Sequence, residues 1–221
     1  HDRDISGTIG YVGDKDVRID TGPYSWSNEV VNRERFDETI RQDARNAALF
    51  TCPTENYRIT DDTLGTVGPK AKFRYNVEAI RTLKAIEAEG RSATPEEQET
   101  LAWYVGWGGI PDAFDQDKSA WTSEYAELKA LLTDEEYASA RASTLNAHYT
   151  SPTVIRAIYK AIGNMGFSTG NILEPACGIG NFFGLLPESM ANSKLYGVEL
   201  DSITGRIAKL LYPKASITVA G

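Results

Sequence analysis

The sequence has little cysteine, no long apolar run and no N-terminal apolar segment. Only Cys52 and Cys177 occur among 221 residues, which is too few for a disulfide framework or a cysteine-based metal cage. No apolar stretch approaches the roughly 20 residues of a membrane-spanning helix. The first ten residues, HDRDISGTIG, lack the apolar core of a secretory signal. We therefore expect a cytoplasmic location, with no membrane partner and no metal.

Positive charge is also scarce. The chain has 23 Lys and Arg residues against 31 Asp and Glu residues, a net charge of −8. Non-specific nucleic-acid binding depends on neutralising phosphates, so this composition excludes a protein that coats DNA over its whole surface. Apolar residues make up 41% and charged residues 24%, as in ordinary globular proteins. The length allows one large domain or two small ones.

Residues 1–69 are polar and repeatedly interrupted by glycine and proline. We interpret them as an irregular N-terminal arm. Residues 8–12 and 16–20 could pair as two short strands, a helix is predicted over residues 32–49, and residues 51–69 are predicted to form a loop.

Residues 70–146 have the pattern of a helical region. Apolar residues recur every three or four positions in its first part, which indicates one buried helix stripe: Phe73, Val77, Ile80, Leu83 and Ile86. The runs Thr94–Glu97 and Thr133–Glu136 are both typical helix starts, with a capping threonine and a glutamate three residues later. We expect three or four helices here.

Residues 147–221 alternate between strand and helix patterns, which predicts parallel strands joined by right-handed crossovers. The fold class is therefore α/β, with the first two to three strands of a partial Rossmann-like sheet. Helices are predicted at 151–165, 181–186 and 203–211, and strands at 171–174, 194–200 and 215–219.

The strongest functional signal is the run Glu174-Pro-Ala-Cys-Gly-Ile-Gly-Asn-Phe182, between the first predicted strand and the next helix. Ligands of open α/β sheets bind at the carboxyl ends of the strands. Gly178 and Gly180 let the backbone come close to a ligand. Glu199 ends the second strand, where an acidic side chain can accept both hydroxyls of a ribose. The pattern predicts a nucleoside-containing cofactor.

Two cofactor classes fit this spacing. Gly178, Gly180 and Gly184 match the G-x-G-x-x-x-G spacing of many NADP enzymes. Glu174 opposes that interpretation, because it places negative charge near the expected pyrophosphate. An acid at this position suits a cofactor with a cationic ammonium and sulfonium.

Two motifs carry a resemblance to a known family. Glu174–Phe182 resembles the first motif of S-adenosylmethionine-dependent DNA methyltransferases that act on the N6 amine of adenine. His148-Tyr-Thr-Ser-Pro152 is similar to the Tyr-Thr-Pro element of that family. Segments 68–74 and 104–109 also resemble the N-terminal part of very large methylase-helicase proteins of bacterial mobile elements. The methyltransferase motifs cover about residues 147–221, and the wider resemblance reaches back to about Asn56.

The resemblance implies S-adenosyl-L-methionine as the cofactor and a role for each matching residue. Glu174 would orient the methionine end, Gly178 and Gly180 would form the floor, and Glu199 would bind the ribose. The remaining cofactor-binding candidates are Tyr149 and Thr150 over the carboxylate, Asp201 and Ile203 near the adenine, and Pro175, Ala176 and Cys177 within the motif. His148 departs from the family, which more often has Tyr or Phe there.

The family's catalytic loop, an Asn/Asp/Ser-Pro-Pro-aromatic run that holds the flipped base, is missing. None of the nine prolines is adjacent to another, and none follows Asn or Asp. We therefore assign no catalytic residue to this chain and expect it to be part of a longer bacterial protein whose other parts bind DNA. Cys177 is expected to be a packing residue.

Two other functions remain open, an NADP-binding oxidoreductase domain and a non-catalytic interaction module. The short sheet has an unpaired edge, which predicts either self-association or coverage of that edge by the N-terminal arm.

Overall fold

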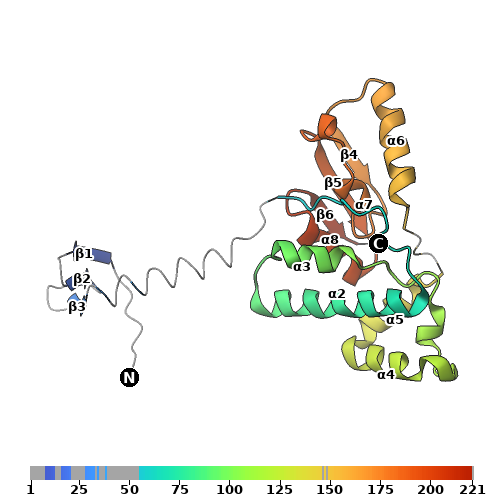
Figure 1. Cartoon of the computed structure of the whole chain (residues 1–221), viewed down its shortest axis with the longest axis horizontal. Coiled ribbons are helices and arrows are strands. Elements are labelled where there is room, and N and C mark those ends of the chain that lie inside the picture. Colours follow the sequence, from blue (N-terminus) through green and yellow to red (C-terminus); the bar gives the residue numbers. More distant parts are fainter. Residues whose placement is uncertain are drawn as a thin grey trace. The chain divides into compact units, whose positions relative to one another are not determined.

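The structure is a computed structural model that describes residues 55–145, 147, 149–220, three strands before them and the isolated residues Glu34 and Glu38. The chain divides into two compact units, residues 1–51 and 52–221. Figure 1 shows the elements of each unit. None of the described helices is long and apolar enough to cross a membrane.

The first unit contains a three-stranded antiparallel sheet in the order β1-β2-β3. The predicted pairing of β1 (Thr8–Val12) with β2 (Asp16–Asp20) is confirmed, with an irregularity between Ile9 and Tyr11. β3 (Asn28–Asn32) was not predicted. It includes the first residue of the helix expected over 32–49, and most of that expected helix lies outside the described residues.

The described part of the second unit starts at residue 55 with a loop, as expected, followed by four α-helices. They are α2 (Pro69–Glu89), α3 (Pro95–Ala102), α4 (Thr122–Leu131) and α5 (Asp134–Ser143), with short 3₁₀ helices η2 (Pro111–Phe114) and η3 (Ser119–Trp121) before α4. Both predicted capping boxes form, because Thr94 and Thr133 each exchange hydrogen bonds with the glutamate three residues on. These starts fix where α3 and α5 begin.

The α/β part follows the predicted order. It contains α6 (Pro152–Asn164), β4 (Asn171–Glu174), α7 (Asn181–Gly184), η4 (Glu188–Met190), β5 (Lys194–Glu199), α8 (Ser202–Leu211) and β6 (Ser216–Val219). The three strands are parallel in the order β4-β5-β6. Among the described residues β4 pairs only with β5. Self-association through that edge stays a prediction.

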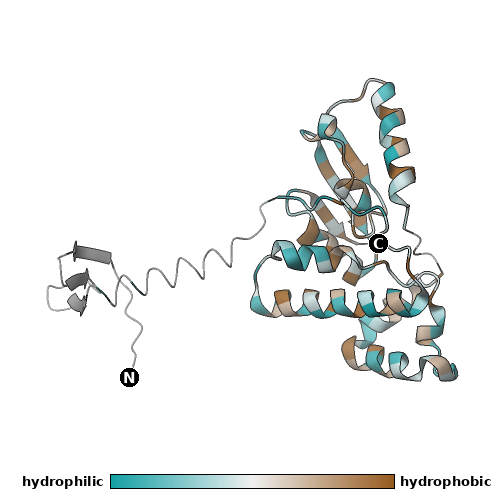
Figure 2. Cartoon of the chain, viewed as in Figure 1, coloured by the Kyte–Doolittle hydropathy of each residue, from teal (hydrophilic) through white to brown (hydrophobic). Residues whose placement is uncertain are grey.

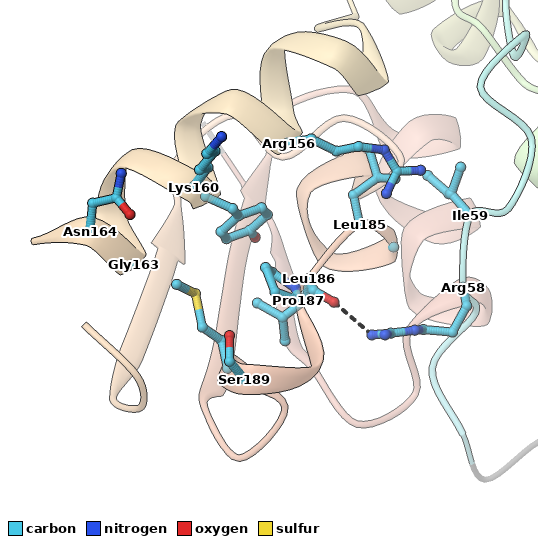
Figure 3. Close-up of a pocket in the computed structure, with 13 residues that line it drawn as sticks. Arg58, Ile59, Arg156, Lys160, Gly163, Asn164, Leu185, Leu186, Pro187 and Ser189 are labelled. Atoms are coloured by element: carbon cyan, nitrogen blue, oxygen red, sulfur yellow. Dashed lines mark hydrogen bonds between the residues drawn. The ribbon is translucent and has the colours of Figure 1, made fainter. Parts of the chain in front are cut away.

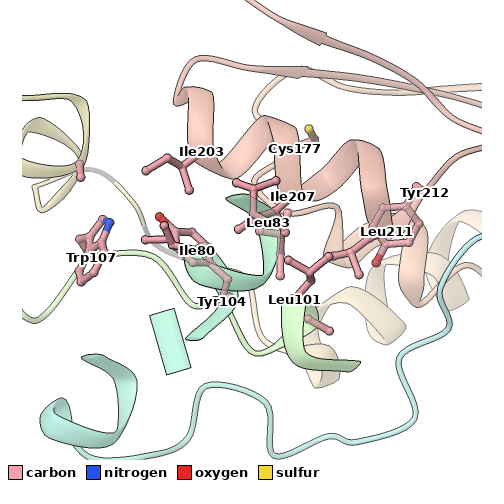
Figure 4. Packing of buried hydrophobic residues seen from close by; sticks show 14 of the residues in the cluster. Ile80, Leu83, Leu101, Tyr104, Trp107, Cys177, Ile203, Ile207, Leu211 and Tyr212 are labelled. Carbon is pink, nitrogen blue, oxygen red and sulfur yellow. The ribbon is translucent and has the colours of Figure 1, made fainter. Parts of the chain in front are cut away.

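The helical region and the α/β part share one core. Figure 4 shows Ile80 and Leu83 of α2 and Leu101 of α3 near Ile207 and Leu211 of α8, and all five side chains are fully buried. Burying each such side chain contributes roughly 1.5–3 kcal/mol. In Figure 2, α2 and α6 carry both hydrophilic and hydrophobic residues, as amphipathic helices do. The domain boundaries at 69/70 and 146/147 stay predictions; the segments 70–146 and 147–221 lie together in the second unit.

Candidate functional site

The turn after β4 is shaped by two glycines. Gly178 and Gly180 have φ angles of +55° and +90°, which L side chains rarely adopt. A Cβ atom at Gly180 would lie 2.5 Å from the ring of Tyr212. The amide of Cys177 donates to the carbonyl of Val198 at 2.9 Å. The turn is therefore held against the end of β5.

Glu199, the last residue of β5, connects this turn to the next helix. Its carboxylate accepts hydrogen bonds from the backbone amides of Gly178 at 2.8 Å and Asp201 at 2.9 Å, one on each oxygen. A carboxylate oxygen has two acceptor positions. Each oxygen of Glu199 therefore keeps capacity for a ligand hydroxyl.

Asp201 caps α8 and reaches the helical region. Its Oδ1 accepts from the amide and hydroxyl of Thr204 at 2.8 and 2.6 Å, and its Oδ2 accepts from the hydroxyl of Ser139 at 2.7 Å. Charge-assisted bonds of this kind are stronger than neutral ones. α5 is thus fixed beside the carboxyl end of β5.

Tyr149 lies between two glycine backbones that belong to different parts of the chain. Built Cβ atoms at Gly106 and Gly178 would lie 2.5 and 2.9 Å from its ring. Gly106 is held by Asn76, a fully buried side chain of α2. Asn76 donates to the Gly106 carbonyl at 2.7 Å and accepts from the Val105 amide at 2.9 Å. The helical region therefore positions Tyr149 against the glycine turn.

These elements enclose a cavity of about 320 Å³, a volume in the range of ligand sites. Eight of the eleven predicted residues line it: Tyr149, Thr150, Glu174, Ala176, Cys177, Gly178, Glu199 and Asp201. Pro175, Gly180 and Ile203 do not. Ile203 is fully buried in the core (Figure 4), and Gly180 shapes the turn from behind. His148 lies outside the described residues. Cofactor binding by the eleven residues stays a prediction.

The helical region also contributes to the cavity wall, which was not predicted from the sequence. The helical region contributes Gly106, which precedes α4, and three residues of α5: Ser139, Ala142 and Ser143. Ala147, which follows α5, also lines the cavity. The lining is completed by Asn181, Phe182, Leu200 and Thr204. The small residues of α5 were a possible signal, because they recur at helical spacing and leave room beside a helix. The glycines at 106, 108 and 109 were another.

The cavity is acidic. Three carboxylates, Glu174, Glu199 and Asp201, line it, and no Lys or Arg does so among the described residues. Burial raises the pKa of Glu174 above its usual value. Burial, and then the charge of Glu199, raises the pKa of the Cys177 thiol to about 12. That thiol is therefore protonated at neutral pH. It packs against Gly197, where a built Cβ atom would lie 2.9 Å from the Cys177 sulfur.

Comparison with known proteins gives one distant similarity. The chain is 26% identical over 145 residues, 66% of its length, to "Defense against restriction protein B" of Escherichia phage P1. The chain spans 5% of the length of that relative. No family model matches the chain, and no solved structure matches it.

Proposed function

We propose that this chain is the cofactor-binding portion of an S-adenosylmethionine-dependent DNA adenine-N6 methyltransferase. In the parent protein, the methyl group would pass from the sulfonium of the cofactor to the exocyclic amine of a flipped adenine. The cofactor would leave as S-adenosylhomocysteine, and the amine would lose one proton. The observation that carries the proposal is the acidic cavity at the carboxyl ends of β4 and β5, bounded by a glycine turn.

The charge of the cavity favours this cofactor over NADP. S-adenosylmethionine carries an ammonium and a sulfonium, and the carboxylate of Glu174, which lines the cavity, would attract either one. A pyrophosphate would instead meet three carboxylates. A carboxylate and a phosphate oxygen that lay 4 Å apart would repel each other by about 4 kcal/mol at an effective dielectric constant of 20. Repulsion of that size from even one carboxylate outweighs a typical hydrogen bond.

The hydrogen-bonding groups also fit a nucleoside. Glu199 is held rigidly by two amides and keeps free acceptor positions for ribose hydroxyls. The Gly178 amide is already used by Glu199, so it is not available to cradle a phosphate. This supports a ribose, rather than a phosphate, at the turn.

The similarity to a phage protein named for defence against restriction is compatible with DNA as the partner of the parent protein. An added methyl group changes the pattern of groups that a base pair presents in the major groove, and so changes what a restriction enzyme reads. We propose that DNA is contacted mainly by other parts of the parent and that the catalytic loop lies there. This chain alone is then expected to bind cofactor and to transfer no methyl group.

Titration calorimetry with S-adenosylhomocysteine and NADP⁺ tests the proposal. The decisive variant is Glu174→Gln, because this side chain makes no hydrogen bond within the described residues. Loss of its charge weakens an ammonium contact by about tenfold, the loss of one charge-assisted hydrogen bond. Glu78→Gln is the control, because Glu78 is exposed on α2 and does not line the cavity.

The outcomes separate the three functions. Binding of S-adenosylhomocysteine that Glu174→Gln weakens and Glu78→Gln leaves unchanged supports the methyltransferase. Tighter binding of NADP⁺ than of S-adenosylhomocysteine supports the oxidoreductase. Binding of neither ligand to a folded chain supports an interaction module.

A further inference from the structure

A second cavity lies beside α6, away from the cofactor cavity. It has a volume of about 460 Å³ and is bounded by α6, residues 58–59 and the segment 184–190. Figure 3 shows Arg156, Lys160 and Asn164 along α6, with Arg58 across from them. The two cavities share no lining residue.

The charge of this cavity is opposite to that of the first one. Arg58, Arg156 and Lys160 line it, and no Asp or Glu does so among the described residues. The chain as a whole has a net charge of −8, so three cations around one hollow are a local exception. Arg156 and Lys160 are four residues apart on one helix face, where like charges repel.

The ion pairs that Arg58 and Arg156 form neutralise the positive charge of this cavity only weakly. Arg156 pairs with Asp62 at 2.7 Å, and Arg58 pairs with Glu188 at 3.4 Å. All four side chains are about half exposed or more. Exposed pairs of this kind contribute little and can be exchanged for a ligand anion. Lys160 has no ion-pair partner within the described part of the chain.

The geometry of the cavity fits a ligand with both a charged and an apolar part. The guanidinium of Arg58 is anchored, because it donates to the Leu186 carbonyl at 2.8 Å (Figure 3). Ile59, Leu186 and Met190 line the same cavity with buried apolar side chains, which we call its apolar floor. Arginine and lysine around a hollow are typical phosphate-binding groups.

We propose that this cavity is a phosphate-binding site for a nucleotide unit, in which Arg58, Arg156 and Lys160 contact the phosphate and the apolar floor supports the sugar or base. The unit is either part of a nucleic-acid strand or a free nucleotide. The proposal does not depend on the cofactor function, because the two cavities have different walls.

The test measures the binding of three probes: a short DNA duplex, adenosine monophosphate and inorganic phosphate. Binding is measured by fluorescence anisotropy or calorimetry. Lys160→Gln is the main variant, because its ammonium makes no hydrogen bond or ion pair within the described residues, so we expect its loss to leave the fold intact. Arg74→Gln is the control. Arg74 is exposed on α2, lines neither cavity and has no ion pair among the described residues.

We expect Lys160→Gln to weaken binding of at least one probe by about tenfold, the effect of one lost charge-assisted contact, and Arg74→Gln to leave it unchanged. If the bound probe is DNA, the slope of log K against log salt falls by about 0.9 for the lost phosphate contact. If it is adenosine monophosphate, the source is a free nucleotide.

Three outcomes would overturn the proposal. One is that none of the probes binds the folded wild-type chain. Another is that Lys160→Gln and Arg74→Gln weaken binding equally, which would mean a general charge effect. The third is that only inorganic phosphate binds, which would mean a site for a small anion and not for a nucleotide unit. Binding of S-adenosylhomocysteine, measured in the same variants, is expected to be unaffected and reports separately on the cofactor cavity.

Discussion

Replacing Gly106 by alanine tests whether the helical region holds Tyr149 in place. Gly106 has a φ angle of +68°, and a Cβ atom there would lie 2.5 Å from Cε2 of Tyr149. The ring has little freedom to move away, because the backbone of Gly178 lies against its other edge. The substitution therefore combines backbone strain with a steric clash.

The two costs can be estimated separately. A left-handed backbone costs a residue with a Cβ roughly 1–2 kcal/mol. An added methyl group in a packed site costs typically 1–3 kcal/mol. Gly106→Ala should therefore lower the free energy of unfolding by about 2–5 kcal/mol, a large share of the roughly 5–15 kcal/mol of a normal domain.

Gly90→Ala is the matched control. Gly90 ends α2 with a φ angle of +63°, and no atom lies within 4 Å of its built Cβ. Its substitution measures the backbone strain alone, about 1–2 kcal/mol. Urea unfolding followed by tryptophan fluorescence gives both values. If Gly106→Ala costs no more than Gly90→Ala, Tyr149 is not confined as described and the reasoning fails.

Two further predictions concern titratable groups. Burial would raise the pKa of Glu136, but hydrogen bonds from Arg206 and Lys84 outweigh it and lower the pKa to about 2. This depressed pKa stabilises the fold above the unfolded value of 4.5, and about 3 kcal/mol of that stability is lost as the pH falls from 4.5 to 2. In urea titrations at each pH, we expect Glu136→Gln to be less stable than the wild type at pH 7 and to lack this loss. The same loss of stability at low pH in the variant would contradict the assignment. Burial and the charge of Glu199 raise the pKa of the Cys177 thiol to about 12. We therefore expect iodoacetamide at pH 8 to alkylate Cys177 far more slowly in the folded chain than in urea, as measured by mass spectrometry of the peptide that contains it. Equal rates would show an accessible thiolate.

Local chemistry explains why much of the second unit could be predicted. The apolar stripe of α2 is fully or almost fully buried, as its spacing required, and two capping boxes marked the starts of α3 and α5. The prediction was wrong for the length of α7: a helix was expected to begin over residues 181–186, and α7 ends at Gly184. Pro187 follows Leu186 and disfavours a helical conformation there, a signal that was present in the sequence.

The site could be predicted only where its residues are neighbours in sequence. The motif at 174–182 and the acid at 199 supplied most of the β-sheet side of the cavity. Gly106 and Ser139 could not be found in this way, because their contacts with Tyr149 and Asp201 depend on which helix faces pack together. Periodicity identifies the buried face of a helix but not its partner.

The two cavities also show why net charge describes a chain better than it describes a site. The composition excluded a protein that coats nucleic acid, and that argument holds for the surface as a whole. α7 nevertheless contributes Phe182 to the acidic cavity and Gly184 to the basic one, and Tyr159 of α6 donates to the Phe182 carbonyl at 2.8 Å. Charges elsewhere on the surface, beyond a Debye length of about 8 Å, are largely screened, so a ligand responds mainly to the residues that line its own cavity. One short helix can therefore contribute to an acidic cavity and to a basic one in a chain of strongly negative total charge.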